Sequence, residues 1–139
     1  MTELAKRNIY SIRLPPQFEY DIICNNNCRI EVKSSRITCK GKWLFSNLRI
    51  KKNVRDGKYI RIITKKDRDC DFYVFVGYDK FLKTNYFIVP REIVNTRKTI
   101  SIFPRKCFMD GKGKYHNSKY WSFLDKWDPI LNFNKALPP

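Results

Sequence analysis

The sequence predicts a single mixed α/β domain, in which a central sheet of four to five strands has helices at its flanks. The chain has 139 residues, which is the usual length of one domain, and we find no internal repeat or linker-like stretch, so residues 1–139 form one unit. Through the middle of the chain, β-branched and aromatic residues gather in short runs that are typical of strands. Near the end, apolar residues recur at helical spacing.

Seven short segments have the composition of strands. The most hydrophobic of them, 71–78, contains Phe-Tyr-Val-Phe-Val and is expected to be a buried central strand. Asn25-Asn26-Asn27 predicts a turn, and Pro15-Pro16 ends the first strand. The predicted strands are 9–14, 19–24, 29–36, 58–64, 71–78, 86–89 and 99–103.

A helix is predicted near the end of the chain. Ser118 is a suitable N-cap, and Pro129 lies just beyond the last turn. We expect the apolar stripe of this helix to pack in the core, although a basic aromatic helix could also stack on bases. The residues at i, i+3, i+4 and i+7 are Tyr120, Phe123, Leu124 and Trp127.

The charge balance favours a polyanionic partner. Lysine and arginine number 29 against 13 acidic residues, so the net charge is +16 and the isoelectric point is about 9.8. Such an excess repels itself in the folded state and is usually retained for nucleic acid. The alternatives are a ribosome-like binder and a surface that is merely basic.

Several classes of protein are disfavoured. No apolar run is long enough to span a bilayer, and no signal peptide, basic amphipathic helix or lipidation motif is seen, so we expect an intracellular, cytoplasmic protein without a membrane partner. The single histidine, His116, excludes paired-histidine zinc sites, and no glycine-rich phosphate loop exists. The five cysteines lack zinc-site spacing beyond the pair Cys24 and Cys28, so we expect reduced thiols.

The most informative segment is the hairpin around the turn 25–27. A three-residue loop places Cys24 opposite Cys28, and the same register then places Asp21 opposite Glu31. Opposed residues share a face of the sheet, with Cβ atoms about 4.5–5.5 Å apart, and two carboxylates so placed repel unless a cation lies between them. A two-residue loop would separate the two acids onto opposite faces.

This acidic pair suits a hard divalent cation. Mg²⁺ prefers oxygen ligands and leaves its other positions to water and phosphate oxygens, and Mn²⁺ can substitute. Lys33 lies two residues after Glu31 and therefore projects to the same side, where it can reach a phosphate. The competing interpretation is a surface hairpin with a Glu19–Lys33 ion pair and a tolerated acidic neighbour.

Asp21 followed by Glu31-Val32-Lys33 resembles the Asp…Glu-x-Lys core of the PD-(D/E)XK nucleases. This superfamily includes restriction enzymes, some intron-encoded homing endonucleases and archaeal Holliday-junction resolvases. The later segments 71–76, 86–93 and 126–128 also look similar in order to its small members. The resemblance implies a restriction-endonuclease-like fold and an endonuclease that hydrolyses DNA phosphodiester bonds with Mg²⁺, yielding 5′-phosphate and 3′-hydroxyl ends.

The resemblance also implies roles for individual residues. Lys33 would orient or help deprotonate the attacking water and stabilise the charge on the phosphorane. Members usually begin with a helix that carries a further acid, a place that Glu3 or Glu19 would take here. The metal would be held by Asp21, Glu31 and Val32, and the catalytic set would be Asp21, Glu31 and Lys33.

A basic, aromatic segment follows this core and is expected to contact the phosphate backbone, its alternative being a solvated face. The partner would be duplex DNA or a four-way junction, and because one active site cuts one strand, we expect a homodimer. A non-catalytic nucleic-acid-binding protein and an RNA-cleaving nuclease are the competing functions. The expected contact residues are Arg36, Lys40, Lys42, Arg49, Lys51 and Lys52.

Overall fold

The fold is taken from a computed structural model of the chain. It describes all residues except 16–19, 47, 56, 66–69, 95–98, 110 and 134–139. For 48–55, 58–65, 108 and 115–117 it describes the backbone alone.

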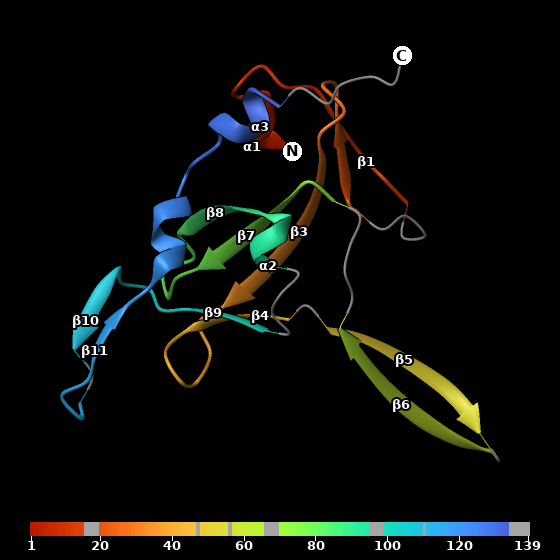
Figure 1. Cartoon of the computed structure of the whole chain (residues 1–139), viewed down its shortest axis with the longest axis vertical. Helices are drawn as coiled ribbons and strands as arrows, with labels where there is room; N and C mark the ends of the chain where they lie inside the picture. Colours follow the sequence, from red (N-terminus) through yellow and green to blue (C-terminus); the bar gives the residue numbers. More distant parts are fainter. Residues whose placement is uncertain are drawn as a thin grey trace.

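A five-stranded mixed sheet forms the centre of the molecule (Figure 1). Its strand order is β1-β2-β3-β7-β8, in which β3 and β7 run parallel and the other neighbours run antiparallel. This confirms the predicted mixed sheet, and the interior position of β7 follows from its nearly continuous apolar run. The strands are β1 (Ser11–Arg13), β2 (Ile22–Cys24), β3 (Arg29–Arg36), β7 (Phe72–Tyr78) and β8 (Thr84–Pro90).

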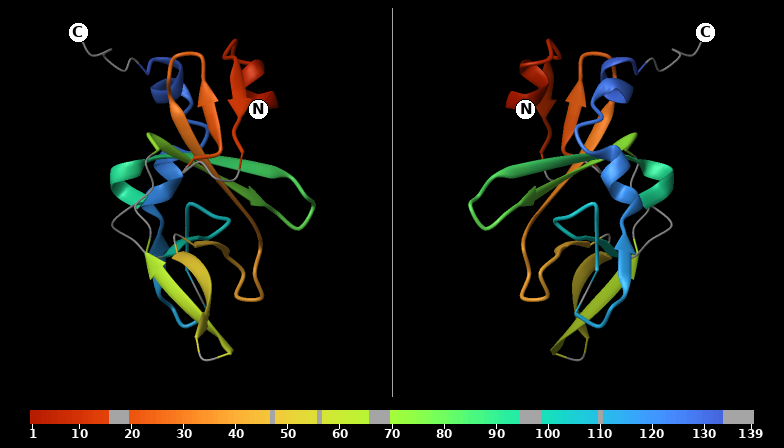
Figure 2. Two further views of the ribbon diagram at one scale, coloured as in Figure 1. Left: turned by 90° about the vertical axis from the view of Figure 1, so that its right-hand side faces the viewer. Right: turned by 90° about the vertical axis from the view of Figure 1, so that its left-hand side faces the viewer.

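The other strands form three separate antiparallel pairs. Within the described residues, each pair is a two-stranded sheet of its own; the first packs against the central sheet, and the second extends away from it in Figures 1 and 2. The pairs are β4 (Trp43–Ser46) with β9 (Thr99–Ile102), β5 (Leu48–Arg55) with β6 (Lys58–Lys65), and β10 (Cys107–Met109) with β11 (Tyr115–Asn117).

The flanking helices are short. Each α-helix spans four residues, and a five-residue 3-10 helix, η1, completes the set in the described part of the chain. No helix there is long and apolar enough to cross a membrane. The helices are α1 (Thr2–Ala5), α2 (Arg91–Val94), η1 (Lys119–Phe123) and α3 (Asp128–Leu131).

The prediction of one continuous helix after Ser118 is wrong. The chain leaves η1 at Leu124, whose backbone is extended and forms a bridge with Phe87 of β8. Asp125 then takes a left-handed conformation at φ 52°, and its N–H donates to the carbonyl of Tyr86 at 2.8 Å. Backbone pairing with the sheet edge therefore replaces the helical hydrogen bonds that the apolar spacing predicts.

The apolar residues of this segment are nevertheless used for packing, as expected. Tyr120 and Trp127 are both buried, but they belong to different hydrophobic clusters. Pro129, predicted to lie beyond a helix, instead occupies the first turn of α3, where its missing N–H costs nothing. The segment thus packs Tyr120, Trp121 and Phe123 on the β4 face of the sheet and Trp127 on the α1 face.

The central sheet is covered on both faces. On the α1 face, α1 and α3 cover a cluster that includes Leu4, Ile22, Ile30, Val74, Ile88, Trp127 and Ile130. On the β4 face, β4, β9 and η1 cover a cluster that includes Trp43, Phe45, Tyr73, Phe75, Phe87, Ile100 and Tyr120. Since side chains alternate along a strand, neighbouring residues of β3 point to different faces.

Candidate active site

The hairpin of β2 and β3 has the register that the sequence predicts. Ile22 pairs with Ile30, and the Cys24 N–H donates to the Cys28 carbonyl at 2.9 Å. The loop closes with Asn27 at φ 65°, a left-handed conformation that asparagine adopts more readily than most residues. Continuing this register places Asp21, just before β2, beside Glu31.

Asp21 contacts the residues on both sides of Glu31. Its N–H donates to the carbonyl of Ile30 at 3.0 Å, and its carboxylate oxygen Oδ2 accepts from the N–H of Val32 at 2.8 Å. The second contact replaces a main-chain hydrogen bond of the ladder with one to a side chain. It therefore holds the Asp21 carboxylate at the start of β2, against the main chain of β3.

Glu31 and Lys33 lie on the β4 face. Glu31 is opposite Tyr73 in β7, and its side chain is only 6% exposed. Its Oε1 lies 3.9 Å from Nζ of Lys33, while its Oε2 is buried and accepts no hydrogen bond from any residue that the structure describes. Burying a carboxylate costs free energy unless a cation compensates it, so this ion pair supports the position of Glu31.

The start of β3 is tied to the start of β7 by a second charged pair that sequence reasoning missed. The main-chain N–H of Arg29 donates to Oδ2 of Asp71 at 2.8 Å, and Nη2 of Arg29 donates to Oδ1 at 3.2 Å. The Asp71 N–H donates back to the Arg29 carbonyl at 2.8 Å. These bonds begin the parallel register that sets Glu31 opposite Tyr73. The sequence signal that could have indicated this pair is Asp71 itself, an acidic residue directly before the most apolar strand.

Cys70 shows how enclosed this end of the site is. Burial, and to a smaller extent the neighbouring Glu31 carboxylate, raise the pKa of its thiol to about 12, although a hydrogen bond with Tyr73 opposes the shift. The thiol therefore stays protonated at neutral pH. A neutral, buried thiol therefore lies near the Glu31 carboxylate.

Arg13 is a further candidate that sequence reasoning missed. A hollow of about 430 Å³ is lined by Met1, Arg13, Asp21, Ile22 and Val32. Arg13 comes to it because β1 pairs with β2, with Arg13 opposite Ile22. Nothing local in the sequence indicates this pairing, which spans two prolines. Glu31 and Lys33 do not line this hollow.

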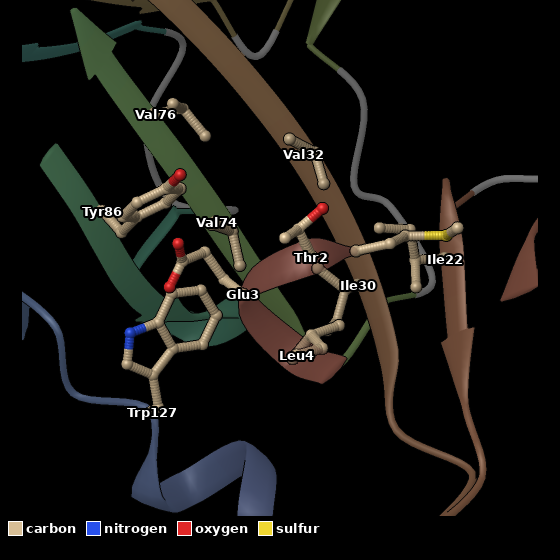
Figure 3. Close-up of a pocket in the computed structure, with 11 residues that line it drawn as sticks. Thr2, Glu3, Leu4, Ile22, Ile30, Val32, Val74, Val76, Tyr86 and Trp127 are labelled. Carbon is tan, nitrogen blue, oxygen red and sulfur yellow. The ribbon is translucent and has the colours of Figure 1, made fainter. Parts of the chain in front are cut away.

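Glu3 lies on the α1 face, away from Glu31. It lines a cavity of about 350 Å³ between α1 and the sheet, together with Ile30, Val32 and Trp127 (Figure 3). Its carboxylate accepts from Arg7 at 2.9 Å and from Lys6 at 3.1 Å, and these bonds lower its pKa. Because Glu31 points to the opposite face, the structure does not bring these two acids together.

The predicted nucleic-acid contacts are spread along the chain beyond this site. Arg36 ends β3 and is exposed, Lys40 is exposed in the turn after it, and Lys42 is half-buried with Nζ 5.9 Å from the Phe103 ring centre. Arg49, Lys51 and Lys52 lie in β5, and their side chains are outside the described part. Glu19, the other candidate acid, also lies outside the described residues.

The donor chemistry of Asp21 and Glu31 fits a hard cation. The two residues hold adjoining positions of the hairpin register, and carboxylate oxygens are ligands that Mg²⁺ prefers over nitrogen or sulfur. Among the described residues, no group of three or more His, Cys, Asp or Glu side chains is arranged to hold a metal ion. Such an ion would therefore depend on main-chain, solvent or phosphate oxygens for its remaining ligands.

Comparison with known proteins places the chain in no family. No family model matches the sequence, and no curated protein matches it either.

Proposed function

We propose that the protein is an intracellular, cytoplasmic, Mg²⁺-dependent endonuclease that hydrolyses DNA phosphodiester bonds with a PD-(D/E)XK-type site. The observation that carries this proposal is the pair of hydrogen bonds by which Asp21 flanks Glu31, with Lys33 3.9 Å from the Glu31 carboxylate. Asp21 directly precedes β2, and Glu31 and Lys33 lie in β3, the strand that pairs with β2. The excess of 29 basic over 13 acidic residues supports a polyanionic substrate.

Each residue of the proposed site would have its own role in the reaction. Asp21, Glu31 and Val32 would hold the cation, which when bound supplies positive charge to the phosphate oxygens. Lys33 orients the attacking water and offsets charge that develops on the phosphorus oxygens. Arg13, which lines the same hollow as Asp21, would hold a phosphate of the substrate by charge-assisted hydrogen bonds.

Cutting a duplex requires two such sites. One site attacks one strand, so a restriction, homing or junction-resolving enzyme of this size would act as a homodimer whose symmetry matches that of its substrate. Equilibrium sedimentation in the presence of DNA tests this part of the proposal.

Cleavage of supercoiled plasmid, a synthetic four-way junction and a matched RNA, each with Mg²⁺ and with EDTA, tests the activity. We expect Mg²⁺-dependent cutting of DNA by the wild-type protein and loss of cutting, on the order of 10²–10³-fold or more, in Lys33→Ala. The matched control is Lys83→Ala, an exposed lysine in the β7–β8 turn, which should cut at the wild-type rate. Equal cutting by both variants would contradict the proposal.

One observation also favours a second function, a non-catalytic nucleic-acid-binding protein. The Glu31–Lys33 pair is buried enough to serve the fold alone, since its side chains are 6% and 22% exposed. That function predicts salt-sensitive DNA binding without cutting on any substrate, and binding that Asp21→Asn leaves unchanged.

A further inference from the structure

The β5–β6 ribbon is the most basic element of the described structure. Each strand has eight residues, and residue pairing runs without a bulge from Leu48 opposite Lys65 to Arg55 opposite Lys58. Neither strand contains an acidic residue. Seven positions are basic, namely Arg49, Lys51, Lys52, Arg55, Lys58, Arg61 and Lys65.

The register divides these residues into two rows, because directly opposed residues share a face. The polar row contains four cations and two further hydrogen-bonding residues, and it consists of Arg49, Lys51, Asn53, Arg55, Lys58, Ile60, Ile62 and Thr64. The aliphatic row contains three cations among mainly apolar residues, and it consists of Leu48, Ile50, Lys52, Val54, Tyr59, Arg61, Ile63 and Lys65. The polar row is therefore the better match to a polyanion.

The shape of the ribbon restricts the partner. It belongs to a two-stranded sheet of its own and extends away from the central sheet in all three views (Figures 1 and 2). An eight-residue strand is about 26 Å long. The major groove of B-form DNA, roughly 12 Å wide, admits a two-stranded ribbon, whereas the major groove of A-form RNA is too narrow for one.

We propose that the β5–β6 ribbon enters the major groove of duplex DNA with its polar row toward the bases. Arginine and lysine pair with guanine edges there, and Asn53 is of the type that pairs with adenine. The inference deepens the proposed function, because it names double-stranded B-form DNA as the substrate.

Binding without cutting tests the inference separately from the nuclease activity. The full chain carrying Lys33→Ala is titrated, in EDTA, into fluorescent duplex DNA, the same sequence as duplex RNA, and single-stranded DNA. We expect duplex DNA to bind at least about tenfold more tightly than the other two at equal salt. Equal affinity for duplex RNA would overturn the inference.

Two triple variants within the ribbon test which row faces the DNA. Lys51→Thr/Arg55→Thr/Lys58→Thr removes three charges from the polar row, and we expect it to weaken duplex binding on the order of 10²-fold. It should also reduce the slope of log affinity against log salt by roughly three. The matched control removes three charges from the aliphatic row, and its fold-loss in affinity for duplex DNA should be less than a third of that of the polar-row variant. Its changes are Lys52→Thr, Arg61→Thr and Lys65→Thr.

Equal losses in the two triple variants would overturn the assigned face. A third triple variant, Lys80→Thr/Lys83→Thr/Lys126→Thr, removes the same charge from the body and should bind within about threefold of the parent. Thermal unfolding of all three checks that the fold is retained.

Competition with small groove binders identifies the groove. Methyl green, which occupies the major groove, should displace the protein, and netropsin, which occupies the minor groove, should not. The reverse result would overturn the inference. Tight, methyl-green-sensitive binding together with no cleavage by wild-type protein would reject the nuclease proposal while leaving the ribbon assignment in place.

Discussion

The carboxylate of Asp21 accepts a hydrogen bond from the main-chain N–H of Val32 at 2.8 Å, so a side chain just before β2 continues the hydrogen-bond ladder between β2 and β3. This contact has a structural part, the satisfied N–H, and a chemical part, the negative charge held next to Glu31. The two parts can be separated by substitution.

Asp21→Asn should keep the structural part of this contact and remove its chemical part. Asparagine keeps an oxygen acceptor for the Val32 N–H but removes the charge, so we expect a loss of less than about 1 kcal/mol in stability and a loss of cutting of at least about 10²-fold. Asp21→Ala, which leaves the N–H unsatisfied, should cost about 1–3 kcal/mol. Urea unfolding and plasmid cleavage measure both effects, and full cutting by Asp21→Asn would count against the proposed site.

The Glu31–Lys33 ion pair should show a measurable coupling energy. Lys33→Met leaves the largely buried Glu31 carboxylate without this cation, and we expect destabilisation by about 1–3 kcal/mol. Glu31→Gln in the same chain should recover part of that loss. A double-mutant cycle by urea unfolding measures the coupling, which we expect at about 0.5–3 kcal/mol. Strictly additive effects would show that the pair contributes nothing to the fold.

Gly77→Ala should disrupt the packing of β4 on the central sheet. A Cβ at Gly77 would lie 2.7 Å from ring atoms of Trp43, which is 1% exposed and whose Nε1 donates to the Tyr78 carbonyl at 2.9 Å. Overpacking of this kind costs about 1–3 kcal/mol and should lower Tm by several degrees. The matched control is Gly111→Ala, where a Cβ meets nothing within 4 Å. Equal Tm values for the two variants would contradict this packing.

Thiol reactivity should divide the cysteines into two classes. Cys39 and Cys107 are exposed, whereas Cys24, Cys28 and Cys70 are buried. With a disulfide reagent at pH 8, two thiols should react at once and three only as the protein unfolds. Fast reaction of more than two thiols in the folded state would contradict the burial described here.

Stability should fall at alkaline pH because of the buried thiols. Burial raises the pKa of Cys24 to about 11 and that of Cys70 to about 12, against about 9 in the unfolded chain. Below pH 9 both states hold these protons, so stability is unaffected; between about pH 9 and 11 only the unfolded state releases them, which favours unfolding. Urea midpoints at pH 7.5 and 10 measure the fall, and Cys24→Ala should reduce it. An equal fall in that variant would assign the effect to other groups.

Local sequence determined the parts of this protein that depend on neighbours along the chain. The three-asparagine loop is short enough to set the β2–β3 register, and that register places Asp21 beside Glu31 without help from the rest of the fold. The apolar run of β7 indicates an interior strand because such a run is stable only when both faces are buried. Net charge likewise depends on composition alone.

Only the tertiary structure decided the relationships between distant segments. Arg13 reaches the hollow beside Asp21 because β1 pairs with β2, and Glu31 becomes buried because β3 pairs with β7, far along the chain. The helical spacing of Tyr120 to Trp127 was overridden when the backbone at Leu124 and Asp125 paired with β8. In each case, contacts between residues far apart in sequence contribute more free energy than the local secondary-structure preference. A local sequence pattern does not reveal these contacts.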